Sequence, residues 1–218
     1  MSYVYMKVLE SAPKRYERGM HLLTLGRIEQ VRRDMAARVR AGEHVLDIGC
    51  GTGALAVMLA RKGAAVTGID IAPPMLSLAA RRRREEGLEE RIALKELGAV
   101  DLDMAFASDS FDVVVSTLVF SELSDDESEY ALPECMRILR PGGLLLVADE
   151  VLPESALGRI GTLLLRLPFA IAAFVLTQNT THRVADLEDQ ISDAGFRIVD
   201  TESYLMGTMK LFVAEKAA

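Results

Sequence analysis

The sequence predicts an α/β protein built on a mostly parallel sheet that is doubly wound by helices. Short, almost wholly apolar runs alternate along the chain with longer segments of helical periodicity, the pattern of strands that are buried on both faces. The first apolar run breaks into closely spaced glycines, and the last two runs are joined by a short connection containing Gly207, which predicts a closing antiparallel hairpin.

A helical segment precedes the first strand. Apolar residues recur at helical spacing between residues 22 and 39, with arginine and glutamate between them, so residues 1–40 are expected to form an N-terminal helical cap. Residues 41–218 then form the α/β domain.

The α/β domain is expected to contain five strands before the hairpin. By residue number these strands are 44–49, 65–70, 91–97, 111–117 and 144–150, and the hairpin strands are 196–204 and 211–216. Helices are expected over 54–63 and 75–87. A further helix opens with a capping-box pattern at Ser124 and Glu127 and ends at the turn Arg140-Pro141-Gly142-Gly143.

Length and composition exclude several classes of protein. The chain of 218 residues has room for one domain plus an elaboration. Half of the residues are hydrophobic and the net charge is −7, which argues against disorder and against nucleic-acid binding through charge. Its only cysteines, Cys50 and Cys135, indicate no disulfide framework and no metal site. Together with an N-terminus lacking a signal-peptide pattern, this predicts a cytoplasmic protein.

The glycine-rich segment Val45–Gly53, VLDIGCGTG, carries the clearest chemical signal. Glycines after a strand let the backbone approach a ligand closely, because no Cβ intrudes and positive φ costs little. Gly49, Gly51 and Ala54 loosely match the dinucleotide pattern G-x-G-x-x-G/A. Asp47, however, precedes the first glycine by two residues, where a carboxylate would repel a pyrophosphate but suit a cationic ligand.

Four motifs together resemble the class I S-adenosylmethionine-dependent methyltransferases. They are VLDIGCGTG, the strand VTGID ending at Asp70, FDVVVS, and LRPGG before the fifth strand, and the resemblance spans residues 16–216. The family implies a Rossmann-like sheet of seven strands with the last one antiparallel. It also implies S-adenosyl-L-methionine as cofactor and S-adenosyl-L-homocysteine as product.

The resemblance assigns cofactor-binding roles along the chain. Asp47 would attract the ammonium group, Asp70 would accept both ribose hydroxyls, and the turn between them would lie against the methionine and ribose. The expected cofactor-binding residues are Tyr16, Asp47, Gly49, Cys50, Gly51, Gly53, Asp70, Ile71, Met75, Gly98, Ala99 and Thr117.

Three of these assignments have alternatives. Tyr16 either touches the ligand from an N-terminal flap or anchors a helix, and Met75 either contacts adenine or packs in the core. Ala99 stands where many relatives have an adenine-binding acid, so that either the backbone at Gly98 and Ala99 or the side chain of Asp101 reads the adenine.

The candidate catalytic residues are Glu122, after the fourth strand, and Glu150, at the end of the fifth. Many small-molecule methyltransferases have a histidine near the first position, and this chain has none there. A general base is needed only if the acceptor loses a proton as it reacts. Glu150 follows Asp149 at this strand end, and loop capping and solvation are the alternative roles, expected for one of this pair.

Residues 151–182 form an insert that is expected to act as a lid. Its apolar segment, 156–176, is interrupted by Arg166, and its longest apolar run, 167–176, is about half of what a bilayer span needs. We therefore expect no transmembrane segment. The segment could cover a hydrophobic acceptor pocket, dock a partner, or lie on a membrane surface.

The sequence thus predicts a methyltransferase that moves a methyl group to a small-molecule or cofactor-like acceptor by in-line displacement. The segments YMKVLE, YERG and LVFSELSDDE resemble a corrinoid protein-associated methyltransferase group, which makes a corrinoid protein a candidate partner. The chain also resembles the ubiquinone and menaquinone methyltransferases at a general level. A non-catalytic binding module of the same fold and an NAD(P)-dependent oxidoreductase are the alternatives, and the oligomeric state is not specified.

Overall fold

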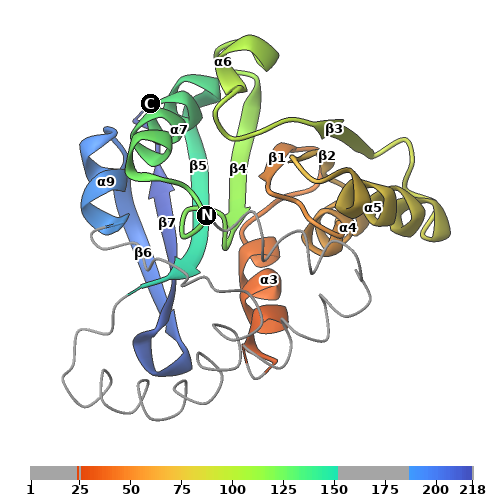
Figure 1. Cartoon of the computed structure of the whole chain (residues 1–218), viewed down its shortest axis with the longest axis horizontal. Coiled ribbons are helices and arrows are strands. Elements are labelled where there is room, and N and C mark those ends of the chain that lie inside the picture. Colours follow the sequence, from red (N-terminus) through yellow and green to blue (C-terminus); the bar gives the residue numbers. More distant parts are fainter. Residues whose placement is uncertain (1–23, 25, 152–186, 218) are drawn as a thin grey trace.

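The computed structural model describes residues 24, 26–151 and 187–217, and they contain a single twisted sheet of seven strands (Figure 1). The strand order is β3-β2-β1-β4-β5-β7-β6. The strands are β1 (His44–Ile48), β2 (Ala65–Asp70), β3 (Ile92–Glu96), β4 (Phe111–Thr117), β5 (Leu139–Glu150), β6 (Arg197–Tyr204) and β7 (Met209–Glu215).

The pairing confirms the expected sheet. Strands β1 to β5 pair in parallel, whereas β7 runs antiparallel to both β5 and β6. From β1 the chain first builds outward to β2 and β3, then returns to place β4 on the other side of β1. The carboxyl ends of β1 and β4 therefore lie side by side where the strand order reverses, which is where open α/β sheets bind their ligands.

Helices cover both faces of the sheet (Figure 1). Alternate residues of the central strands pack against α3 and α4 on one face and against α7 and α9 on the other, forming two core clusters. The helices are α3 (Arg27–Ala37), α4 (Ala54–Arg61), α5 (Pro73–Glu85), α6 (Leu102–Ala105), α7 (Asp125–Ile138) and α9 (Leu187–Asp193), and a 3-10 turn, η1, spans Leu205–Gly207.

The start of α7 matches the predicted capping box. Ser124 Oγ accepts the Glu127 N–H at 3.3 Å, and the Glu127 carboxylate accepts the Ser124 N–H at 2.8 Å. These two bonds satisfy backbone groups that the first helical turn leaves unpaired.

The start of β5 differs from the expectation. The strand begins at Leu139 rather than Leu144, because the predicted turn is a bulge inside the strand. Phe111 pairs with Leu139 and Val113 with Leu144, so the intervening residues of β5 bulge out opposite β4. A Cβ on Gly143 would lie 2.8 Å from the Arg140 carbonyl oxygen, so the fold requires glycine there.

Parts of the expected cap and lid lie outside the described residues. Helix α3 belongs to the predicted N-terminal cap. The predictions for Tyr16 and for residues 152–182 of the lid, with the apolar segment 156–176, concern residues that the structure does not describe. No helix in the described part of the chain is long and apolar enough to cross a membrane.

Candidate cofactor-binding and active site

A cleft lies at the carboxyl ends of β1 and β4. It has a volume of about 410 Å³, counted with the space that opens to solvent. The residues that line it are Ile28, Arg32, Asp47, Gly49, Cys50, Gly51, Thr52, Leu55, Thr117 and Leu118. The fold thus gathers five of the predicted cofactor residues, and it adds side chains of α3 and α4 that the motifs did not indicate.

The three glycines of the turn have different structural roles. All have positive φ: 66° at Gly49, 52° at Gly51 and 75° at Gly53. A Cβ on Gly49 would lie 2.2 Å from Val119 Cγ2, and one on Gly53 would lie 3.0 Å from Ala79 Cβ. A Cβ on Gly51 would meet nothing closer than the Gly49 carbonyl oxygen at 4.0 Å. Gly49 and Gly53 are therefore needed for packing, whereas Gly51 leaves room for a ligand.

We expect Gly49→Ala and Gly51→Ala to separate folding from binding. The first change adds a clash with Val119 to an unfavourable φ and should lower the free energy of unfolding by about 2–4 kcal/mol. Gly51→Ala adds only the cost of placing alanine at a positive φ, about 1–2 kcal/mol of unfolding free energy. Its new methyl group, however, projects into the cleft. Chemical denaturation and binding titrations with S-adenosylhomocysteine would measure both effects. Equal stability losses would contradict the different roles of the two glycines.

Asp47 is a buried carboxylate without a full set of partners. Its side chain is 2% exposed, and its Oδ2 has no hydrogen-bond partner among the described residues. Burial raises the pKa of Asp47 to about 7; the Arg32 charge opposes this rise and the Asp70 charge adds to it. A buried carboxylate with one unsatisfied oxygen at a cleft is stabilised by a ligand that brings a cationic hydrogen-bond donor.

Asp70 is fixed by the turn that it faces. Its Oδ2 accepts the Gly51 N–H at 2.8 Å and its Oδ1 accepts the Ala72 N–H at 2.9 Å. Burial raises the pKa of this carboxyl, while the two backbone hydrogen bonds lower it. Because each carboxylate oxygen can accept more than one hydrogen bond, the anchored group can still receive the two hydroxyls of a ribose.

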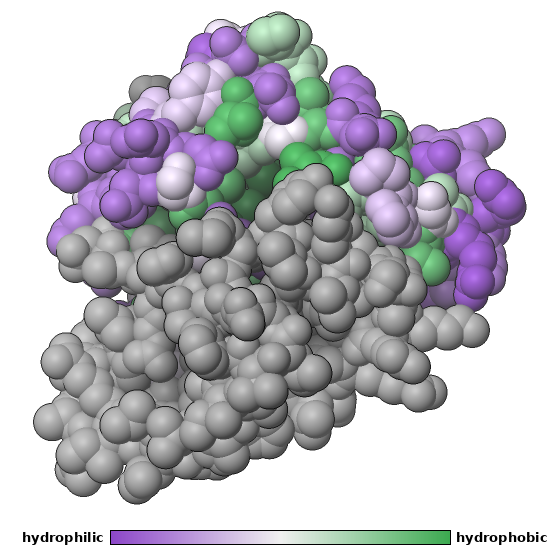
Figure 2. Space-filling model, in the orientation of Figure 1, coloured by the Kyte–Doolittle hydropathy of each residue, from purple (hydrophilic) through white to green (hydrophobic). Residues whose placement is uncertain are grey.

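Apolar surface lies near the ends of β2 and β3. Ile71 and Val100, which follow these strands, are 63% and 40% exposed. On the face of the molecule drawn in Figure 2, apolar patches lie among mostly polar side chains. The side chains of Ile71 and Val100 both lie within 4 Å of the position that a Gly98 Cβ would take. Exposed aliphatic side chains of this kind suit the flat face of an aromatic ring such as adenine, and an adenine contact of Ile71 stays a prediction.

The Gly98 loop after β3 is where the sequence predicts recognition of the adenine base. The Gly98 N–H donates to Asp101 Oδ2 at 3.1 Å, so the carboxylate beside Gly98 comes from Asp101 rather than from position 99. Ala99 and Met75 are both buried. The adenine contacts of Met75, Gly98 and Ala99 stay predictions.

The loop after β4 has a strained start. Leu118 has φ 60°, a conformation that costs a bulky residue roughly 1–2 kcal/mol, and its N–H donates to the Ala148 carbonyl at 2.8 Å. Leu118 lines the cleft, and Val119 contacts the position above Gly49. The strained turn thus closes one side of the cofactor cleft.

Asp149 stands beside Glu150 at the end of β5 and is not among the predicted catalytic residues. It is fully buried, its Oδ2 accepts the Ser121 N–H at 3.2 Å, and burial raises its pKa to about 6. It therefore holds the β4–α7 loop against the end of β5. Glu122 is exposed and Glu150 is half-buried. Their catalytic roles stay predictions.

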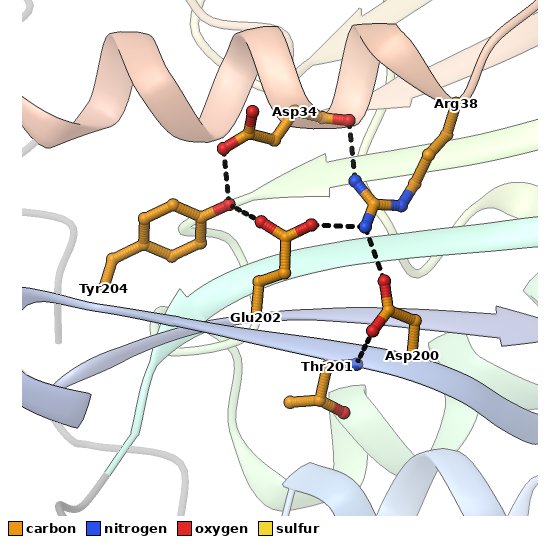
Figure 3. Close-up of polar contacts among 6 residues, drawn as sticks. All are labelled: Asp34, Arg38, Asp200, Thr201, Glu202 and Tyr204. Carbon is orange, nitrogen blue, oxygen red and sulfur yellow. Dashed lines mark hydrogen bonds and ion pairs between the residues drawn. The ribbon is translucent and has the colours of Figure 1, made fainter.

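Helix α3, which carries Arg32 to the cleft, is anchored at its other end by polar contacts with β6 (Figure 3). The Tyr204 hydroxyl lies 2.7 Å from Asp34 Oδ2 and 2.6 Å from Glu202 Oε2. The Arg38 guanidinium contacts Glu202 and Asp200, the latter at 2.6 Å. These contacts fix the position of α3 over the sheet.

Tyr204→Phe keeps the ring but removes the hydroxyl between two acids. We expect a loss of about 1–3 kcal/mol in the free energy of unfolding, since hydrogen bonds to charged groups are worth that much. Hydrogen exchange should become faster in α3 and stay unchanged in α7, which packs on the opposite face and provides the internal control. Unchanged exchange in α3 would show that the contacts in Figure 3 do not anchor it.

Comparison with known proteins agrees with this geometry. Residues 45–143 match the model of a methyltransferase domain. The chain is 39% identical over 157 residues to a demethylmenaquinone methyltransferase of Thermus thermophilus, which covers 69% of this chain and 68% of that protein. It is 41% identical over 114 residues to methyltransferase GfsG of Streptomyces halstedii, covering 52% of this chain but only 40% of that protein.

A solved structure shares the fold at low sequence identity. The [4+2]-cyclase SpnF superimposes with a TM-score of 0.69 at 22% identity, over 87% of this chain and 80% of the cyclase. This similarity concerns the fold alone, because one fold can support unrelated reactions.

The fold and the site define a Rossmann-like protein that binds an adenosyl ligand with a cationic group. The chain belongs to the class I S-adenosylmethionine-dependent methyltransferase family. The residues fit this cofactor: Asp47 Oδ2 has no hydrogen-bond partner in the described part of the chain, Asp70 presents two anchored carboxylate oxygens, and Gly51 faces open space.

Proposed function

We propose that this protein transfers a methyl group from S-adenosylmethionine to a small apolar acceptor. The observation that carries the proposal is the buried Asp47 carboxylate at the cofactor cleft, whose Oδ2 has no hydrogen-bond partner within residues 24, 26–151 and 187–217. S-adenosylmethionine supplies an electrophilic methyl group on a sulfonium, and it has an ammonium group that would complete the hydrogen bonding of Asp47. A dinucleotide would instead place a pyrophosphate near this carboxylate, which is electrostatically unfavourable.

The protein's main task in such a reaction is to hold the acceptor against the methyl group and exclude water. Positioning of this kind can supply roughly 7–11 kcal/mol of the barrier. Leu118, held in its strained turn, and Val119 above Gly49 form the rigid boundary of the cleft on the β4 side. Asp149 holds the following loop, which carries Glu122, the candidate base.

The acceptor is proposed to be a hydrophobic small molecule. Ile28, Leu55 and Leu118 give the cleft apolar lining beside its charged residues. The Thermus relative is named for a quinone precursor, demethylmenaquinone. The apolar segment 156–176, proposed to be part of a lid, would add to this lining.

Two narrower possibilities are separate candidates for testing. A corrinoid protein as acceptor is supported only by the sequence segments that suggested it. A non-catalytic binding module is supported by the exposure of Glu122 and by Ala99 standing where many relatives have an acid.

The decisive experiment is a two-stage assay on the full chain. Thermal shift and calorimetry with S-adenosylmethionine, S-adenosylhomocysteine and NAD(P)H should show binding of the first two only. Methyl transfer from labelled S-adenosylmethionine would then be screened on demethylmenaquinone, ubiquinone precursors, other phenols and a corrinoid protein. Product formation on a small apolar acceptor is the expected result. Binding of NAD(P)H alone would overturn the proposal, and cofactor binding without transfer to any acceptor would favour the binding module.

A further inference from the structure

The loop that joins β4 to α7 begins with a strained residue at the edge of the cofactor cleft. Leu118 lines the cleft and has φ 60°, a backbone conformation that a bulky residue keeps only where the surrounding structure imposes it. Its N–H donates to the Ala148 carbonyl at 2.8 Å, next to the last paired residues of β4 and β5. This bond fixes one end of the turn, and the other end needs a separate support.

The second support comes from Asp149, the next residue of β5. Its Oδ2 accepts the Ser121 N–H at 3.2 Å, and the Ser121 side chain bonds to the same carboxylate. Its Oδ1 accepts the Glu150 N–H at 2.7 Å, which holds the carboxylate against its own strand. Two consecutive residues of β5 therefore hold the turn from Leu118 to Ser121 at both ends.

Packing alone does not explain an acid at position 149. Asp149 is fully buried, and the alternation along β5 places it on the same face as Val147, which packs with Phe120 in the apolar cluster beneath α7 and α9. Within the described residues no ion pair reaches Asp149, so hydrogen bonds alone offset the burial of its charge. An apolar side chain would fill this position without that cost. The acid instead gives the loop a fixed position.

We propose that Asp149 is a positioning residue for methyl transfer, because it keeps Leu118 in the strained turn that bounds the cleft on the β4 side. The inference rests on the proposed function and concerns the transfer step rather than cofactor binding. Asp47 and Asp70, which are expected to hold the cofactor, lie on β1 and β2, and β4 separates these strands from β5.

The effect on the reaction follows from the strain at Leu118. Without Asp149, the Leu118 backbone can relax toward a negative φ, and its side chain then leaves the boundary of the cleft. An acceptor would no longer be held firmly against the methyl group. A displacement of about 1 Å at a reacting centre can lower the rate roughly 100-fold.

The first part of the test follows Leu118 itself and needs no acceptor. NMR chemical shifts of Leu118 Cα and Cβ report its φ, in the full chain saturated with S-adenosylhomocysteine. In Asp149→Ala these shifts should move toward those of a negative φ, and hydrogen exchange of residues 118–121 should become faster. Asp149→Asn keeps one oxygen acceptor, so it should give an intermediate result. Unchanged Leu118 shifts in a folded Asp149→Ala protein would overturn the inference.

The second part measures the transfer step, with demethylmenaquinone as the first acceptor. Asp149→Ala should lower kcat by about 10–100-fold and leave the affinity for S-adenosylhomocysteine little changed, and Asp149→Asn should recover part of kcat. Asp112→Ala is the matched control and should leave kcat unchanged. Asp112 also accepts a backbone N–H, that of His44 at 2.7 Å, but at the amino ends of the strands, away from the cleft. If cofactor affinity falls as much as kcat, Asp149 supports the whole cleft and the inference is wrong.

Leu118→Gly tests the route of the effect. Glycine adopts a positive φ at little cost, so this variant keeps the turn but loses the side chain that bounds the cleft. Its kcat should already be low, and adding Asp149→Ala should lower it little further. Fully additive losses would show that Asp149 does not act through Leu118. A wild type that methylates no acceptor would overturn the proposed function and the kinetic part of this inference, while the NMR shifts still decide whether Asp149 holds Leu118.

Discussion

Asp70→Ala should weaken S-adenosylhomocysteine binding at least tenfold. The Asp70 carboxylate is expected to accept two ribose hydroxyls, and each charge-assisted hydrogen bond is worth roughly 1.5–3 kcal/mol. A second effect acts in the same direction, because the Gly51 N–H now donates to Asp70 Oδ2. Without that acceptor, the Gly51 backbone loses the hydrogen bond that holds the glycine turn in place beside the ligand. Isothermal titration at constant pH measures the change.

Asp70→Asn provides the control for this prediction. The amide keeps the side-chain volume and one oxygen acceptor, so that it can hold one of the two backbone N–H groups while losing the negative charge. Its affinity should fall between those of the wild type and Asp70→Ala. Circular dichroism of both variants would show whether the fold is retained. An Asp70→Ala protein that is folded and binds with unchanged affinity would remove Asp70 from the ribose site.

The strands and the glycine turn could be predicted because their signals are local. A buried parallel strand must be apolar along its length, and a turn that passes close to a ligand must contain glycine. The position of Asp47, two residues before Gly49, then fixes a carboxylate in the strand that leads into the turn. The structure added that this carboxylate is buried and that its Oδ2 accepts no hydrogen bond from the described residues, which the spacing could not reveal.

Other features depend on how distant segments pack and have no local signal. Arg32 reaches the cleft only because α3 lies across the sheet, anchored by Tyr204 on β6, far away in sequence. In the sequence it is one of several arginines on an amphipathic helix. Asp149 and Glu150 form an acidic pair at the end of β5, and only the structure shows that Asp149 is the buried one.

The three glycines illustrate the same limit. The motif treats them as equivalent, but two make room for protein atoms of the β4–α7 loop and α5, while Gly51 faces open space. The glycines that packing requires are those next to Val119 and Ala79. The positions of these two side chains follow from the packing of the sheet and helices and cannot be seen in the motif.

Asp47 should make both stability and cofactor affinity depend on pH. In the folded protein its pKa is raised from 3.8 to about 7. Between these values the folded state holds a proton that the unfolded state has lost, so stability falls as pH rises from about 4 to about 7. The full difference corresponds to roughly 4 kcal/mol at most. Asp47→Asn carries no such charge, so it should be more stable than the wild type at pH 8 and similar at pH 4.

Ligand binding should reverse the preference of Asp47 for the proton. An ammonium group beside the carboxylate stabilises its charged form, so that binding below pH 7 must release a proton. The affinity for S-adenosylhomocysteine should rise up to tenfold per pH unit until about pH 7 and then level off. Titrations in buffers with different ionisation enthalpies would count the released protons directly.

Asp47→Asn distinguishes the pH dependence caused by Asp47 from that caused by other titrating groups. Asp70 and Arg32 are the charges that act on Asp47, and Asp149, whose pKa is raised to about 6, titrates in the same range. All three are retained in Asp47→Asn, so the difference between the two proteins belongs to Asp47. The variant should bind with little pH dependence between 6 and 7 and more weakly than the wild type at pH 8. Proton release that persists in the variant would assign the pH dependence to another group, with Asp149 the first to examine.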